Sequence, residues 1–184
     1  IMMTEISEFL LVALSHLILF VILLRLYLQL VRANFRNPLA QAIVQLTSPI
    51  VVPVRRIIPP IGQVDTATLI VAYAIQVLLI ACLWLLYGIQ PHASIFGIAV
   101  FELAAMSIKL FLWSSVIRVV LSGVAPGNYS PANALIDELT RPVLQPFRRW
   151  IKPVGGFDLS PLAAILALNV GLIIVNNLKR SFLS

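Results

Sequence analysis

Four apolar stretches dominate this sequence, and each is about as long as a membrane-spanning helix. A bilayer core about 30 Å thick is crossed by about 20 helical residues at a rise of 1.5 Å per residue. The chain is 60% hydrophobic and 11% charged, whereas soluble domains are roughly 45–50% apolar and about 25% charged. So few charged side chains cannot cover a water-soluble surface. The sequence therefore predicts an all-α multi-pass membrane protein and excludes an ordinary cytosolic enzyme, a disordered tail and a disulfide scaffold.

The predicted spans cover about residues 7–30, 66–89, 94–122 and 159–178. The second and fourth are free of charge, whereas the third carries Glu102, Lys109 and Arg118. Two further segments, about 37–60 and 130–154, are too polar to span the membrane and too apolar to leave its surface. The predicted order is therefore span, polar segment, span, repeated once.

The sequence also aligns with itself. Pro49 aligns with Pro142, an offset of 93 residues, and no gap is needed across some forty positions. At this offset Arg25 meets Arg118, Pro53 meets Pro146, Gly62 meets Gly155 and Asp65 meets Asp158. Such self-similarity indicates an internal duplication, with predicted repeats at 1–92 and 93–184. Because two spans separate the copies, we expect parallel repeats related by a pseudo-two-fold axis along the membrane normal.

The two polar segments are predicted to be amphipathic helices. Asn37-Pro38 and Ser130-Pro131 each supply an N-cap residue followed by proline at the first helical position, and apolar residues then recur at steps of three or four. Each segment is expected to form two short helices, with Ser48-Pro49 and Arg141-Pro142 marking a break or a kink between them. We expect these helices to lie in the membrane interface. A re-entrant loop lining a pore is the alternative.

The net charge of +6 comes largely from arginines that flank the apolar stretches. In a soluble protein such an excess suggests nucleic acid, but here anionic lipid headgroups explain it, so no nucleic-acid partner is expected. The positive-inside rule places the arginine segments in the cytoplasm and both termini outside, with Lys179 and Arg180 counting against this topology. The residues predicted to contact lipid or a docked partner are Arg55, Arg56, Arg148, Arg149 and Lys152.

Five polar side chains inside the spans form a candidate network. They are His16, Gln76, Glu102, Lys109 and Asn169. Four of them fall near the middle of their helices, whereas Glu102 lies seven residues before Lys109 on the same helical face, where the two can pair. Polar residues at this depth usually face the bundle interior. They are interpreted either as an ion or proton path built on His16, Lys109 and Glu102, or as hydrogen bonds that hold the helices together.

Arg25 and Arg118 lie near the cytoplasmic ends of their spans. We expect their side chains to extend toward lipid phosphates. The alternative ties each arginine to Asp65 or Asp158 of its own repeat and fixes the start of the next helix.

The chain contains no catalytic signature. It has no Gly-x-Ser-x-Gly, P-loop or His-Glu-x-x-His sequence, and neither of its two histidines has a partner at metal-ligand spacing. We therefore expect no enzymatic activity, no cofactor and no metal.

A paired signature resembles that of the YggT family of membrane proteins. Its spacing, Pro-x-Arg-Arg-x-x-x-Pro-x-Gly-x-x-Asp, occurs at residues 53–65 and again at 146–158, with Lys152 standing where the first copy has Pro59. The resemblance covers the whole chain and implies a bacterial inner-membrane protein with relatives in cyanobacteria and chloroplasts. It also implies links to osmotic or potassium tolerance, to placement of division or nucleoid components and to cytochrome assembly in plastids, which share no single mechanism.

These observations predict a non-enzymatic role as a membrane organiser, assembly factor or accessory subunit. The arginine helices would engage anionic headgroups and other membrane proteins, including further copies of the chain. The rival prediction is a small oligomeric channel or transporter active in ion or osmotic homeostasis.

Overall fold

In the computed structural model, the described residues are 2–124, 130–151 and 158–183, and this part of the chain is all-helical. The helices are α1 (Met2–Leu30), α2 (Pro38–Ile57), α3 (Thr66–Leu86), α4 (Ser94–Val124), α5 (Pro131–Trp150) and α6 (Ser160–Leu183). Four of them, α1, α3, α4 and α6, are long and apolar enough to cross a membrane. These helices fit the predicted multi-pass membrane protein.

The span boundaries differ from the predicted ones by a few residues. α1 begins at Met2 and α6 continues to Leu183, both beyond the apolar cores on which the predictions rest. α3 ends at Leu86 because Gly88 takes a left-handed conformation with φ of +72°, and the Ile89 N–H donates to the Trp84 carbonyl over 2.8 Å. This is the usual way in which glycine ends a helix.

The predicted break within each arginine segment is wrong. α2 and α5 are each one helix of 20 residues, continuing through Pro49 and Pro53 in α2 and through Pro142 and Pro146 in α5. A proline inside a helix removes one backbone hydrogen bond. Packing of α2 against α1 and α3, and of α5 against α4 and α6, holds these helices together despite that loss.

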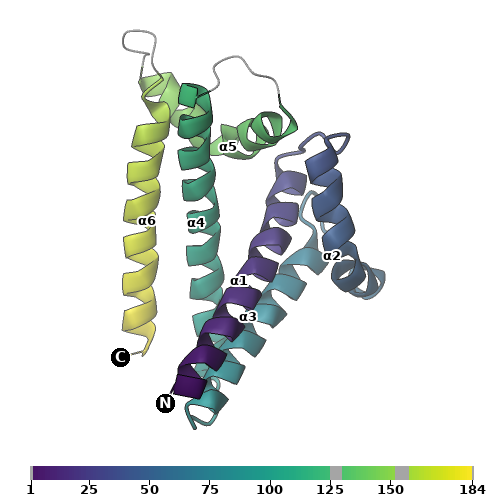
Figure 1. The fold of residues 1–184 in the computed structure, drawn as a ribbon, viewed down its shortest axis with the longest axis vertical. Helices are drawn as coiled ribbons and strands as arrows, with labels where there is room; N and C mark the ends of the chain where they lie inside the picture. Colours follow the sequence, from purple (N-terminus) through teal and green to yellow (C-terminus); the bar gives the residue numbers. More distant parts are fainter. Residues whose placement is uncertain (1, 125–129, 152–157, 184) are drawn as a thin grey trace.

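The helices form two arms, shown in Figure 1. α1, α2 and α3 pack together in one arm, and α4, α5 and α6 pack together in the other. α3 and α4 join the arms near the end where both termini lie, and the arms diverge toward the opposite end, which carries α2 and α5. This opposite end is called the arginine end below.

The buried core lies mainly in the first arm. The largest cluster of buried apolar residues draws on α1, α2 and α3, with Leu103 and Leu110 from α4 and Leu135 and Leu139 from α5. In α6, by contrast, the described buried residues are confined to Ser160, Pro161 and Ala164 near its start. The side of α6 that does not face α4 is therefore exposed to lipid or to a partner.

Candidate functional site

At the arginine end, α2 and α5 are both capped at their first turns, as the sequence predicts. The Asn37 side chain accepts a hydrogen bond from the Leu39 N–H over 2.9 Å at the start of α2. The Ser130 hydroxyl accepts one from the Asn133 N–H over 3.1 Å at the start of α5. Each cap satisfies a backbone donor that the first helical turn leaves free.

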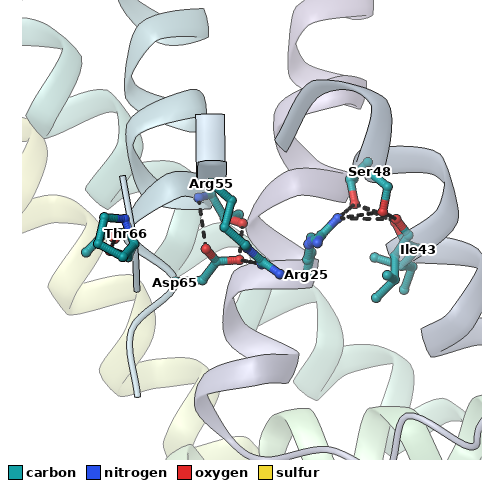
Figure 2. A network of polar contacts seen from close by, with 10 residues as sticks. Arg25, Ile43, Ser48, Arg55, Asp65 and Thr66 are labelled. Atoms are coloured by element: carbon teal, nitrogen blue, oxygen red, sulfur yellow. Dashed lines mark hydrogen bonds and ion pairs between the residues drawn. The ribbon is translucent and has the colours of Figure 1, made fainter. Parts of the chain in front are cut away.

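Arg25 is buried and binds α2 instead of extending to lipid phosphates. Arg25 is only 4% exposed. The Nη1 atom donates to the Thr47 hydroxyl at 2.7 Å, to the Val44 carbonyl at 3.2 Å and to the Ser48 hydroxyl at 3.3 Å. Figure 2 shows the guanidinium directed at Ser48. The alternative prediction, in which Arg25 pairs directly with Asp65, is also wrong, because Asp65 pairs with Arg55.

Arg118 repeats this contact in the second arm. Its Nη1 atom donates to the Thr140 hydroxyl at 3.2 Å and pairs with the Asp137 carboxylate at 2.6 Å. Thr140 and Asp137 stand one repeat offset after Thr47 and Val44. Both arginines therefore hold the arginine helix of their own arm onto the preceding span. In the sequence, Leu46-Thr47 aligns with Leu139-Thr140 at the repeat offset, but the role of the threonines could not be assigned without the fold.

Asp65 caps α3 and pairs with Arg55. It is 1% exposed, and its carboxylate accepts hydrogen bonds from the Thr68 hydroxyl at 2.5 Å and from the Arg55 guanidinium (Figure 2). Burial by itself raises the pKa of Asp65, but the hydrogen bonds from Thr68 and Arg55 outweigh it, so the pKa lies below its ordinary value. Gly62, just before this cap, has φ of +61° in a turn closed by two hydrogen bonds between Ile61 and Val64.

The equivalent pair in the second arm is more open to solvent. The Arg148 Nε atom donates to Asp158 over 2.9 Å, and the two side chains are 41% and 40% exposed. Burial raises the pKa of Asp158, but hydrogen bonds from Ser160 and Arg148 bring it below the ordinary value. Gly155 and Lys152 lie outside the described residues.

The two residues of each arginine doublet therefore have different roles. Arg55 and Arg148 pair with aspartates, although the Arg148 side chain stays 41% exposed. Arg56 and Arg149 are exposed, and each is followed by an exposed apolar residue, Ile57 and Trp150 respectively. Arg56 and Arg149 are therefore the doublet arginines most open to an external ligand, and the prediction that the doublets contact lipid or a partner stays a prediction.

The two arms also contact each other at the arginine end. The Asn34 N–H donates to the Glu138 carboxylate over 2.9 Å, and the Asn37 amide donates to the Pro131 carbonyl over 2.7 Å. α2 and α5 thus form a joined layer instead of two independent helices.

The polar side chains inside the spans are distributed over several places. His16 and Lys109 line one shallow groove between α1 and α4, and both are exposed in the isolated chain. Glu102 pairs with Lys179 at 2.6 Å, so the expected pairing with Lys109 is replaced. Gln76 is buried in α3, whereas Asn169 is exposed and donates to the Ile165 carbonyl of its own helix.

Within the described ranges, no group of three or more His, Cys, Asp or Glu side chains is placed to hold a metal ion.

The duplicated contacts coincide with a duplicated family signature. The model of the CCB3/YggT family matches the chain twice, over residues 4–86 and 97–178. The chain belongs to the CCB3/YggT family. Each match contains one complete set of these contacts, made by Arg25 or Arg118 and by the arginine–aspartate pair of the same arm.

Relatives within the CCB3/YggT family confirm the resemblance predicted from the signature. An uncharacterized protein of Pseudomonas aeruginosa is 41% identical over 174 residues, covering 92% of this chain and 88% of its own length. The uncharacterized protein YggT of Escherichia coli K12 is 34% identical over 162 residues, covering 88% and 85% respectively. The chloroplastic YlmG homolog protein 2 of Arabidopsis thaliana is 33% identical over 85 residues, or 45% of this chain and 32% of its own. No solved structure matches the chain.

Proposed function

We propose that this protein is a non-enzymatic organiser of the bacterial inner membrane, acting as an assembly factor or accessory subunit. In this proposal the joined layer of α2 and α5 binds anionic lipid headgroups and presents a surface to partner proteins. The observation that carries it is the division of each arginine doublet, in which one arginine fastens the layer and the other stays exposed beside Ile57 or Trp150.

The exposed side chains of this layer suit a membrane interface. The exposed arginines described at this end are Arg32, Arg36, Arg56, Arg141, Arg148 and Arg149. Ile57 and Trp150 are 82% and 89% exposed, at equivalent positions of the two arms. Arginine beside tryptophan is typical of side chains that lie at headgroup level. Continuous, capped helices support the interfacial arrangement over a re-entrant loop.

The proposal includes a topology. The halves 1–92 and 93–184 form parallel repeats, with the arginine end in the cytoplasm and both termini on the other side. The positive-inside rule and the charge of the arginine end support this orientation.

The depth of Trp150 tests the interfacial arrangement. In a variant with Trp84→Phe and Trp113→Phe, Trp150 is the sole tryptophan. We expect lipids brominated near the headgroup to quench its fluorescence in vesicles that contain phosphatidylglycerol. Adding Arg56→Gln and Arg149→Gln is expected to reduce this quenching, because each arginine near an anionic surface contributes about 1 kcal/mol.

Arg180→Gln is the matched control, since Arg180 is also exposed but lies at the other end of the chain. Quenching of Trp150 by aqueous iodide alone would contradict the interfacial arrangement. If the doublet variant keeps its quenching but loses a co-purifying protein, the arginines serve partner docking instead of lipid binding.

The groove formed by His16 and Lys109 favours a second candidate, a small oligomeric channel or transporter. A charged side chain at the bilayer centre costs roughly 2.5–3.5 kcal/mol on insertion scales, so Lys109 would face water or another copy of the chain. Liposome flux of potassium and protons, compared between wild type and Lys109→Leu, tests this candidate. It predicts flux that the substitution reduces, and absence of flux from the wild-type protein would exclude it.

A further inference from the structure

A cavity of about 430 Å³ lies between the two arms at the arginine end. Its walls come from the end of α1, from Phe111 of α4 and from the middle of α5. The volume is within the range of small-molecule sites, about 300–1,000 Å³. The doublet arginines are not part of its lining, which instead includes Arg32 and Arg141 from the exposed arginines of this end.

The lining is divided into a charged part and an apolar part. Arg32 and Arg141 supply two positive charges, and Glu138 supplies one negative charge that already accepts the Asn34 N–H at 2.9 Å. The apolar part includes Tyr27 and Phe111, whose rings meet edge to face with centroids 4.7 Å apart. A lining that combines two arginines with aromatic and aliphatic side chains fits a ligand with an anionic head and an apolar tail.

The duplicated architecture does not require either arginine. At the repeat offset Arg32 corresponds to Ala125, and Arg141 corresponds to Ser48. The contacts that fasten α2 and α5 are present in both arms, whereas these two charges occur in one arm each. Their presence at the cavity is therefore an addition to the fold.

Arg32 is also held in a conformation that glycine would adopt more easily. Its φ is +55°, directly after α1, and the neighbouring Ala33 N–H donates to the Leu28 carbonyl over 2.9 Å to close the helix end. The left-handed conformation costs roughly 1–2 kcal/mol for a residue with a Cβ atom. A position that favours glycine but carries arginine suggests that the charge is used.

We propose that this cavity binds one anionic phospholipid, with its phosphate between Arg32 and Arg141 and part of an acyl chain along Tyr27 and Phe111. Basic pockets between membrane helices on the cytoplasmic side suit such headgroups. The inference deepens the proposed function, because it rests on the arginine end facing the anionic leaflet. A lipid bound here would touch both arms and hold them at a fixed separation.

The test uses full-length protein that has been stripped of lipid in a non-ionic detergent. Phosphatidylglycerol, phosphatidylcholine and inorganic phosphate are titrated separately, with bound lipid counted by native mass spectrometry and the thermal unfolding midpoint followed in parallel. We expect one phosphatidylglycerol per chain, a raised midpoint, at least tenfold weaker phosphatidylcholine binding and no shift with phosphate. Arg141→Ser and Arg32→Gly are each expected to weaken phosphatidylglycerol binding by about tenfold or more, as loss of a charge-assisted contact implies.

Arg32→Gly carries a built-in check on folding. Because it relieves the left-handed backbone, the lipid-free variant is expected to unfold at the same or a higher temperature than wild type. Arg180→Gln and Arg180→Ser are the control variants, since Arg180 is exposed but lies outside the cavity lining and at the other end of the chain. These controls are expected to bind phosphatidylglycerol as wild type does.

Three results would overturn the site. Equal binding of the two lipids would remove the role of the headgroup charge, and an equal shift with inorganic phosphate would show an ion site instead of a lipid site. Equal losses in the control variants would indicate general attraction to the basic surface. That last outcome would not contradict the proposed function. Conversely, failure of the Trp150 experiment would contradict the proposed function but would not exclude lipid binding in the cavity.

Discussion

Replacing Arg25 by alanine is expected to lower the free energy of unfolding by about 3 kcal/mol. Hydrogen bonds from charged groups contribute about 1.5–3 kcal/mol each, and buried acceptors left without a donor cost about 1–3 kcal/mol. Arg25 donates to Val44, Thr47 and Ser48 of α2 from a buried position. Thermal unfolding in detergent is expected to shift down by roughly 6–12 °C, since 1 kcal/mol corresponds to about 2–4 °C for a chain of this size.

The same substitution is expected to loosen α2 before the spans unfold. Trypsin should then cleave after Arg55 or Arg56 at temperatures at which the wild-type helix resists it. Arg118→Ala is the matched control, because Arg118 makes the equivalent contact in a more solvated place. Its side chain is 19% exposed, and that of its partner Asp137 is 53% exposed. Solvated ion pairs contribute about 0–1 kcal/mol. Equal destabilisation by both variants would contradict the view that burial gives Arg25 its larger contribution.

Replacing Asp65 by alanine is the second change with a large expected effect, again about 3 kcal/mol. The substitution removes the cap of α3, which is worth about 0.5–2 kcal/mol, and leaves Arg55 without its carboxylate. Asp158→Ala is the internal control and is expected to cost about 1 kcal/mol, because that pair is two-fifths exposed on both sides. Chemical or thermal unfolding of the two variants under identical conditions measures the difference.

The pH dependence of the Asp65 effect follows from its lowered pKa. A carboxyl whose folded pKa lies below its unfolded value contributes stability that is complete above the unfolded pKa and is lost as the pH falls through the folded pKa. The stability gap between wild type and Asp65→Asn is therefore expected to be full near neutral pH and to shrink below about pH 4. A gap that stays constant down to pH 2 would show that the charge of Asp65 contributes nothing.

The backbone plan of this protein follows from local sequence properties. Apolar runs of sufficient length predict α1, α3, α4 and α6, and the cap-proline pairs predict where α2 and α5 begin. Helix ends were less predictable, because they depend on single backbone conformations such as that of Gly88. The prolines of α2 and α5 predicted breaks that do not occur, since packing against neighbouring helices overrides a local preference.

The side-chain partners at the arginine end could not be predicted in the same way. The repeat pairs Arg25 with Arg118 and Asp65 with Asp158, but it does not say which arginine reaches which carboxylate. Asp65 lies ten residues after Arg55 and forty after Arg25, and only the turn at Gly62 brings the nearer arginine back to it. The expected pairing of Glu102 with Lys109 failed because α6 places Lys179 within reach.

By itself, the sequence determined the membrane class, the repeated signature and the starts of the arginine helices, because apolar length, spacing and capping act over a few residues. The tertiary structure decided which charged side chains pair inside the protein and which remain exposed to external ligands. A charged side chain is buried only where another element supplies its partner, and that partner comes from a neighbouring helix whose position no short stretch encodes. The cavity between the arms, lined by Arg32 of the segment after α1 and Arg141 of α5, likewise depends on how distant segments are placed together.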